Sequence, residues 1–381
     1  MADERDDSQE REPLSWRVRR WAAPIAMAAS VAASIAAVQV LADDSVPSED
    51  SHGNDRRPRF MLTVGRMAES PPDDGPATWL QVRAIQPDGR TRSVNSVEPP
   101  SPSAGEAREI LAGPKGTLVV VGTRKRPCES RFYRFKLTDD GHAESIESFR
   151  DEPVPARVAG LAISPDGKRL AYAQAPCTSH TQQRAEPRAK VTVLDIGSGH
   201  NRTWSTVAPS VIGEIVWAGD SRTLGYTVSD VHSYTSPGSD IQPGQMHPPI
   251  GRAVDNVTVH VLDTNAPGTD LRGGRVLFRQ EAGSGPVTTA AMNPDGRTGY
   301  GAMKRTQPPS TLIFSFSEGE PIHITKTIPH KPNTLTAIAF SRGDEPRYAC
   351  LNGLDSFGRV TEGSFIEDPN GTTGCEVAYA Y

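Results

Sequence analysis

The four cysteines carry the most specific chemistry in the sequence, because an even number of cysteines can close into disulfides. They are Cys128, Cys177, Cys350 and Cys375. No two of them form a Cys-x-x-Cys pair, so the sequence gives no support to a zinc ribbon or a thioredoxin-like motif. Four cysteines allow three pairings, and free buried thiols are the alternative.

Motifs for nucleophilic or metal-assisted catalysis are missing. No Gly-x-Ser-x-Gly stretch appears, and segment 355–358 (DSFG) lacks a glycine two positions before its serine. The nine histidines are scattered and form no His-Glu-x-x-His motif. His232 and His247 share one segment with Asp230 and Asp240, which leaves a metal site there as an alternative to solvated side chains. We therefore predict no catalytic residue, no metal and no cofactor.

Basic and aromatic side chains are better suited to binding than to catalysis. We expect the following residues to contact a ligand: Arg124, Lys125, Arg126, His232, Tyr234, His247, Lys304 and Arg305. Cations that share one face, with Arg184 and Arg188 beside them, can attract an anionic wall polymer or lipid headgroups. An ordinary charged surface is the alternative. The formal net charge of −5 argues against a nucleic-acid partner, because the chain has no global basic surface.

The elements that must position these residues are short strands joined by tight turns. In LAISPDGKRLAYA (161–173) an apolar run, a Ser-Pro-Asp-Gly turn and a second half-apolar run follow one another. Pro165 presets φ for a type I turn, and Gly167 accepts a positive φ. Related stretches recur about 50 residues apart, with one wider gap, a spacing typical of propellers. These stretches are 110–122, 215–227, 290–302 and 338–350.

A second hairpin follows each of these stretches, so each repeating unit should contain four antiparallel strands. Six units are expected, with five or seven as alternatives. Their approximate ranges are 59–98, 107–149, 158–207, 212–279, 287–328 and 335–381. The first unit lacks its innermost strand. A strand within Cys375–Tyr381 would complete it and remove exposed sheet edges, or it would simply end the sixth unit.

The repeated turn resembles that of TolB-type and WD-repeat-like propellers, with Ser164 to Lys168 and Asn293 to Arg297 as its best copies. The resemblance covers residues 59–381 and implies an all-β fold, a β-propeller of six four-stranded blades. It says almost nothing about function, because this turn belongs to the scaffold. Arginine outnumbers lysine and alanine is abundant, which indicates a bacterial, actinobacterial source.

The resemblance also implies that the loops between the second and third strands of the blades share one face, where propellers usually bind. These loops are unequal here: 124–130, 173–188 and 229–255. Long loops on a rigid scaffold often carry recognition, although tolerated insertions are the alternative. Cys128 and Cys177 would occupy matching places in neighbouring blades, so we predict a disulfide between them and a second one between Cys350 and Cys375.

The N-terminal region differs from the rest of the chain. Trp21 to Ala42 contains no charge and is long enough for a bilayer, which needs about 20 apolar residues. Arginines precede it and acidic residues follow it, so the positive-inside rule places the rest of the chain outside the cytoplasm. A cleaved signal peptide, giving a secreted protein, is the alternative. The predicted parts are a cytoplasmic tail (1–20), a transmembrane signal anchor (21–42), a flexible linker (43–58) and the propeller (59–381).

These observations favour a membrane-anchored propeller outside the cytoplasm that works as a non-catalytic binding or scaffold module. Its partner would be a protein, a peptide or a cell-wall polymer. The alternative is a propeller-type hydrolase or lyase with its site at the channel mouth, built from side chains of several blades. A sensor is a third option, but the cytoplasmic tail has no room for a signalling domain.

Overall fold

A computed structural model describes most of the second of two compact units, Met1–Arg56 and Arg57–Tyr381. The described residues are 59–64, 79–86, 91–100, 104–148, 150, 152–175, 188–235, 250–329, 337–340, 348–352, 356–361, 364–368 and 377–380. The predicted tail, anchor and linker (1–20, 21–42 and 43–58) lie outside them. No helix within the described residues is both long and apolar enough to cross a membrane.

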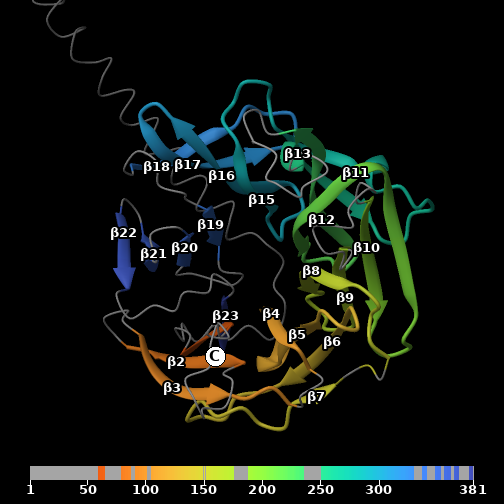
Figure 1. Cartoon of the computed structure of the whole chain (residues 1–381), viewed down its shortest axis with the longest axis vertical. Helices are drawn as coiled ribbons and strands as arrows, with labels where there is room; N and C mark the ends of the chain where they lie inside the picture. Colours follow the sequence, from red (N-terminus) through yellow and green to blue (C-terminus); the bar gives the residue numbers. More distant parts are fainter. Residues whose placement is uncertain are drawn as a thin grey trace, which may run out of the picture. The chain divides into compact units, whose positions relative to one another are not determined.

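Antiparallel sheets make up nearly all of the described fold (Figure 1). The first sheet has the order β23-β1-β2-β3, with β1 at Phe60–Val64, β2 at Leu80–Ile85, β3 at Thr91–Val97 and β23 at Val377–Ala380. The second sheet contains β4 (Glu106–Ala112), β5 (Leu118–Arg124), β6 (Glu129–Phe135) and β7 (Glu147–Ser148). The short 3-10 turns η1 (Pro114–Gly116) and η2 (Leu271–Gly273) are the helical elements among the described residues.

The following strands form one seven-stranded sheet and two four-stranded sheets. The large sheet contains β8 (Arg157–Ile163), β9 (Arg169–Ala175), β10 (Arg188–Asp195), β11 (Asn201–Trp217), β12 (Thr223–Thr235), β13 (Ile250–Asp263) and β14 (Arg275–Arg279). The next contains β15 (Val287–Met292), β16 (Thr298–Thr306), β17 (Pro309–Ser317) and β18 (His323–Pro329). The last contains β19 (Ala337–Phe340), β20 (Tyr348–Asn352), β21 (Ser356–Thr361) and β22 (Ser364–Asp368).

The seven-stranded sheet is two four-stranded groups that share β11. The first part of this 17-residue strand pairs with β10, from Asn201 to Pro209. The second part pairs with β12, from Ser210 to Trp217. Thus β11 is the last strand of the group that begins with β8 and the first strand of the group that ends with β14. The sequence predicted two separate units, 158–207 and 212–279, and the structure joins them through one continuous strand.

The C-terminal strand closes the first sheet, as the sequence predicted. Residues of β23 pair with β1, with Ala380 opposite Phe60 and Val377 opposite Thr63. This pairing brings the first and last strands of the unit side by side. β23 also contacts β4 of the second sheet. The first strands of successive sheets contact each other as well, β4 with β8, β11 with β15 and β15 with β19. Figure 1 shows the sheets of this unit following one another around a common axis.

The core lies between neighbouring sheets, and this explains why several strands are apolar on both faces. On β5, Val120 belongs to the cluster shared with the first sheet, whereas Val119 and Val121 belong to the cluster shared with the third. All three side chains are at most 2% exposed. Phe132 and Tyr172 meet across the same boundary, with ring centroids 5.1 Å apart. A strand buried on both sides reads as a continuous apolar run rather than an alternating one.

The repeated turn has the geometry that its residues predict. Gly167 adopts a φ of 71°, and the Asp166 carboxylate accepts hydrogen bonds from the Ser164 hydroxyl at 2.6 Å and from the Lys168 N–H at 3.1 Å. In the next copy Ser221 occupies the glycine position with a φ of 52°. The Ser221 hydroxyl accepts a hydrogen bond from the Asp166 N–H at 3.2 Å, so a residue strained in its own turn ties that turn to its neighbour.

Candidate functional site

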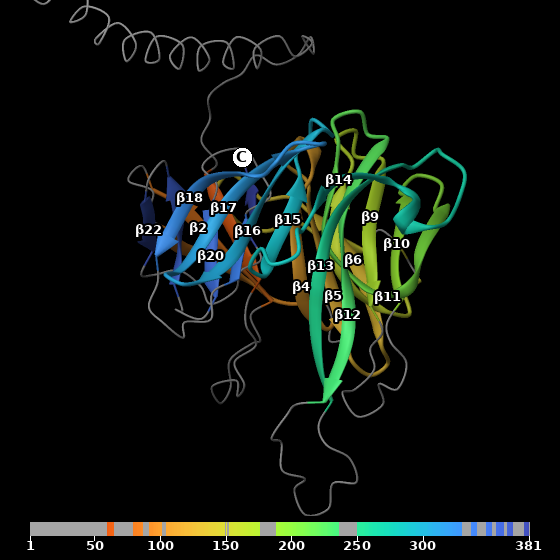
Figure 2. The same cartoon turned by 90° about the horizontal axis from the view of Figure 1, so that it is seen from above.

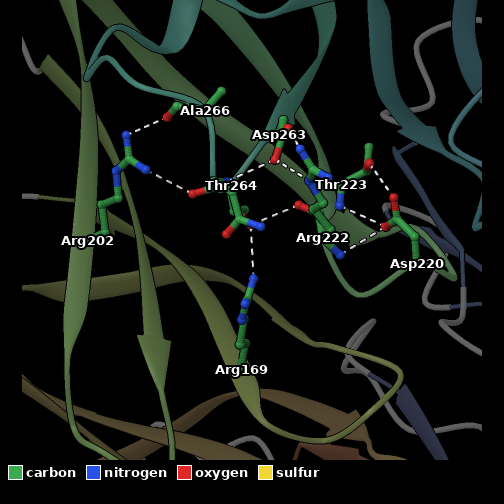
Figure 3. Close-up of polar contacts among 9 residues, drawn as sticks. Arg169, Arg202, Asp220, Arg222, Thr223, Asp263, Thr264 and Ala266 are labelled. Atoms are coloured by element: carbon green, nitrogen blue, oxygen red, sulfur yellow. Dashed lines mark hydrogen bonds and ion pairs between the residues drawn. The ribbon is translucent and has the colours of Figure 1, made fainter.

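The rim that carries the repeated turns is held together by polar groups that bond to each other. Figure 3 shows Arg222 paired with Asp263, with the Arg222 Nε donating to the Asp263 Oδ1 at 2.8 Å. The same contact lowers the pKa of the Asp263 carboxyl to about 2. Arg202, from a neighbouring hairpin, donates to the carbonyl oxygens of Thr264 at 2.9 Å and Ala266 at 2.6 Å.

Two cavities of about 540 and 430 Å³ lie along this rim. Charged side chains in both cavities have partners: Asp220 accepts from the backbone N–H groups of Arg222 and Thr223, at 2.9 and 2.8 Å, and Arg275 donates to the Gly296 carbonyl at 2.9 Å. Within the described part of the chain, no group of three acidic, histidine or cysteine side chains could hold a metal. We therefore assign this rim to the scaffold.

A third cavity of about 380 Å³ lies beside β13 and β14. It contains a hydrogen-bonded ion pair between Arg272 and Asp230. His260 is buried here, with its Nδ1 3.4 Å from the Gly274 carbonyl oxygen, and burial lowers its pKa. A neutral imidazole and a partly buried ion pair fit a structural role within the seven-stranded sheet.

The opposite ends of the same strands carry the predicted basic residues. Arg124 ends β5, and Lys125 and Arg126 lie in the turn before β6. The Arg124 guanidinium lies 3.3 Å from the Glu129 carboxylate, and the Lys125 ammonium lies 3.8 Å from the Glu106 carboxylate. The Lys125 side chain is 79% exposed, so these cations face solvent next to the first strand of their sheet.

Ser130 docks the start of β8 onto this hairpin and brings a further arginine to it. Ser130 is fully buried at the start of β6. Its hydroxyl donates to the Ala156 carbonyl at 2.8 Å and accepts from the Val158 N–H at 3.1 Å. The residue between these two contacts is Arg157, so the two bonds fix Arg157 beside the β5–β6 turn. The Thr123 hydroxyl also hydrogen-bonds to the Ser130 hydroxyl, with the two oxygens 2.9 Å apart.

We call the residues gathered here the basic cluster: Arg108, Arg124, Lys125, Arg131 and Arg157, with the carboxylates of Glu106 and Glu129. Glu106 pairs with both Arg108 and Lys125, and Glu129 pairs with both Arg124 and Arg131. Arg157 has no carboxylate at ion-pair distance among the described residues. Among the described contacts, four cations therefore share two carboxylates, and the fifth, Arg157, pairs with neither.

The electrostatics of Arg157 reflect this imbalance. Burial lowers the pKa of its guanidinium, and the positive charge of Arg108 lowers that pKa further, while Glu106 acts against both. Because β4 and β8 are the first strands of neighbouring sheets, the two arginines approach each other across a sheet boundary. Arginine stays charged at any ordinary pH, so the repulsion persists.

The remaining predicted residues lie elsewhere. Lys304 and Arg305 are on β16, in a different sheet, where the Arg305 Nε donates to the Ser310 hydroxyl at 3.1 Å. His232 and Tyr234 are on β12. Of the other residues expected to face a ligand, Arg188 is the exposed first residue of β10, whereas Arg184 and His247 lie outside the described residues.

The prediction of a loop over 229–255 is wrong at both ends. β12 continues to Thr235 and β13 begins at Ile250, and they pair from Val231 opposite Val254 to Thr235 opposite Ile250. β11 pairs with β12 only as far as Asp230, and β14 pairs with β13 only from Thr258. We call residues 231–235 and 250–254 the ribbon, because within the described part of the chain these segments pair with each other and with no third strand. Figure 2 shows both strands projecting beyond the sheet.

The cysteine predictions are tested in part only. Cys128, in the β5–β6 turn, is disulfide-bonded. Cys177 and Cys375 lie outside the described residues, and the pairing of the four cysteines stays a prediction. Sequence reasoning missed Arg108, Arg157 and Ser130, which are strand residues rather than loop residues. The sequence does contain a signal for the two arginines: each lies near the beginning of the first strand of its unit, and the two units follow one another in the chain.

Comparison with known proteins supports the fold and no particular activity. No family model matches the chain, and no curated protein matches its sequence. A chain from the crystal structure of a nidogen/laminin complex matches with a TM-score of 0.50 and 8% identity, over 84% of this chain and 98% of that one. The periplasmic gluconolactonase PpgL of Pseudomonas aeruginosa has a TM-score of 0.48 and 15% identity, over 84% and 99%. The structural neighbours are β-propeller-type proteins, and at these identities the likeness concerns the fold alone.

Proposed function

We propose that the protein is a six-bladed β-propeller outside the cytoplasm, tethered by residues 21–42, that recognises a protein partner without catalysing a reaction. The ribbon of β12 and β13 is the recognition element. The sheets supply a rigid platform, and their loop-bearing rim supplies further contacts. A protein secreted after cleavage of the same segment would recognise its partner in the same way.

The observation that carries this proposal is the projection of the ribbon beyond its sheet. Residues 231–235 and 250–254 pair with each other but not with β11 or β14. A two-stranded ribbon is only marginally stable in water, so extending it adds little to the stability of the fold. Among the described residues, no third strand pairs with the outer edge of either ribbon strand, and an extended peptide can bind to such an edge.

The structural neighbours are compatible with this proposal. One of them is a propeller chain from a complex of two proteins, nidogen and laminin. The basic cluster points the same way, because its cations lie on the loop-bearing rim and are partly exposed. Neither observation names the partner of this chain.

Cross-linking on intact cells tests the proposal. The full-length protein should recover a protein partner from the wall or membrane fraction. In a shortened variant, the dipeptide Asn-Gly replaces residues 232–253. It links Val231 to Val254, which is its partner across the ribbon. We expect the shortened variant to keep its melting temperature within a few degrees and to lose the partner. Recovery of no partner by the wild type, or equal recovery by a stably folded shortened variant, would overturn the proposal.

A further inference from the structure

The basic cluster contains more positive charge than its own carboxylates neutralise. Four of its cations pair with Glu106 and Glu129, and Arg157 is the fifth cation. Glu109 on β4 is a further carboxylate, buried at 5% exposure. With Glu109 counted, the described members of the cluster are five cations and three carboxylates. Like charges held together at a partly buried position are unfavourable unless an opposite charge joins them.

Two arginines in the cluster have unused hydrogen-bonding capacity. The Nε of Arg108 is buried and has no hydrogen-bond partner. Arg157 is exposed and forms no hydrogen bond or ion pair with any described residue, and the positive charge of Arg108 acts on it. A guanidinium offers five N–H donors in a planar fork that matches the two oxygens of a carboxylate. The pair thus presents donors and charge without the acceptor that would satisfy them.

We propose that Arg108 and Arg157 form the centre of an anion site that binds a carboxylate of an acidic segment in a protein partner. This inference rests on the proposed function, because it names the chemistry of a partner that the propeller recognises. Lys125, 79% exposed, and the exposed Arg126 extend the positive surface outward from this centre. A segment with several aspartate or glutamate residues fits that surface better than a single small anion does.

The existing contacts favour carboxylates as the ligand. Glu106 already bridges Arg108 and Lys125, and Glu129 already bridges Arg124 and Arg131. Each of these two carboxylates thus serves two cations. A carboxylate from the partner would bridge Arg157 and Arg108 in the same manner. Ser130 holds Arg157 in place through the backbone on either side of it, so little backbone freedom is left to lose on binding.

The test is binding of a fluorescent octaglutamate peptide to the full-length protein in detergent micelles at low salt, measured by anisotropy. Octaglutamine is the uncharged comparison. We expect octaglutamate alone to bind, and we expect Arg157→Gln and Arg108→Gln each to weaken binding about tenfold, as for loss of one charge-assisted contact. Binding should also weaken as salt rises. The matched control is Arg297→Gln, which removes an exposed arginine from the turn-bearing rim and should leave binding unchanged.

Three results would overturn the inference. The wild type could fail to bind octaglutamate, or Arg157→Gln could bind it as well as the wild type does. Thirdly, Arg297→Gln could weaken binding as much as Arg157→Gln. The loss of any one positive charge would then explain the weaker binding, and Arg157 would have no specific role. If inorganic polyphosphate bound more tightly than octaglutamate and depended on Arg157 in the same way, the ligand would be a phosphate polymer and not an acidic peptide. The ribbon-shortened variant should still bind octaglutamate, so failure of this site and failure of the ribbon proposal can be told apart.

Discussion

Replacing Ser130 by alanine should destabilise the propeller. Among the described residues from β4 to β9, no other substitution that removes one hydroxyl should cost as much stability. The Ser130 hydroxyl is fully buried and serves three partners, the Ala156 carbonyl, the Val158 N–H and the Thr123 hydroxyl. Leaving a buried polar group without a partner costs about 1–3 kcal/mol. Two orphaned backbone groups and one orphaned hydroxyl therefore predict a loss of about 3 kcal/mol in the free energy of unfolding.

Equilibrium unfolding in urea, followed by tryptophan fluorescence, measures this loss. The control is Ser284→Ala, because the Ser284 hydroxyl makes one bond to a carbonyl in an exposed turn and should change stability by less than about 0.5 kcal/mol. Thr123→Val supplies a double-mutant cycle with Ser130→Ala. The Thr123 hydroxyl bonds to Ser130 alone among the described residues, so its removal should cost about 1 kcal/mol less in the Ser130→Ala background.

Two results would refute the reasoning. If Ser130→Ala lowered stability no more than Ser284→Ala does, the hydroxyl would not dock β8 onto the second sheet. If the effects of Ser130→Ala and Thr123→Val were strictly additive, the two hydroxyls would not depend on each other. A further consequence is measurable in the same variant. Because Ser130 positions Arg157, binding of octaglutamate should weaken even where the protein remains folded.

Three further predictions concern a turn, a titration and a disulfide. Lys115 is exposed and adopts a φ of 58°, so Lys115→Gly should raise the free energy of unfolding by about 0.5–1 kcal/mol in the same urea assay; a loss of stability would contradict the strain. The pKa of Asp263 is lowered to about 2 from 3.8, so its contribution to stability is present above pH 3.8 and disappears as pH falls toward 2. Melting temperatures from pH 5 to 2 should therefore fall less steeply in Arg222→Gln than in the wild type, and identical slopes would exclude this pair as a cause. Peptide mapping without reduction should recover Cys128 linked to Cys177, whereas a link to Cys350 would contradict the predicted order of the blades.

Much of the candidate site could be predicted from the sequence, but its central pair could not. Arg124 and Lys125 follow a strand in a recognisable hairpin, so their exposure near a loop-bearing rim was accessible from local pattern. Arg108 and Arg157 lie in strands, where a charged residue does not by itself indicate a binding surface. Their proximity depends on how two sheets pack, which no local pattern encodes.

The sequence by itself determined the local geometry and the repeat. Pro165 and Gly167 determine one turn through backbone stereochemistry, and runs such as the one that begins β5 predict strands buried on both faces. The pairing of the C-terminal strand with β1 also followed from counting strands, because an incomplete first unit needs a partner to cover its edge.

Only the tertiary structure decided which distant residues act together. Ser130 contacts the start of β8 from another hairpin, and that contact places Arg157 beside Arg108. The ribbon likewise exists because β11 turns away to pair with β10 while β12 and β13 continue together. Such arrangements are set by packing between sheets. The physical reason is that the pattern of apolar residues along a strand indicates which side chains are buried. Which residues they contact in the neighbouring sheet depends on the register of a strand elsewhere in the chain.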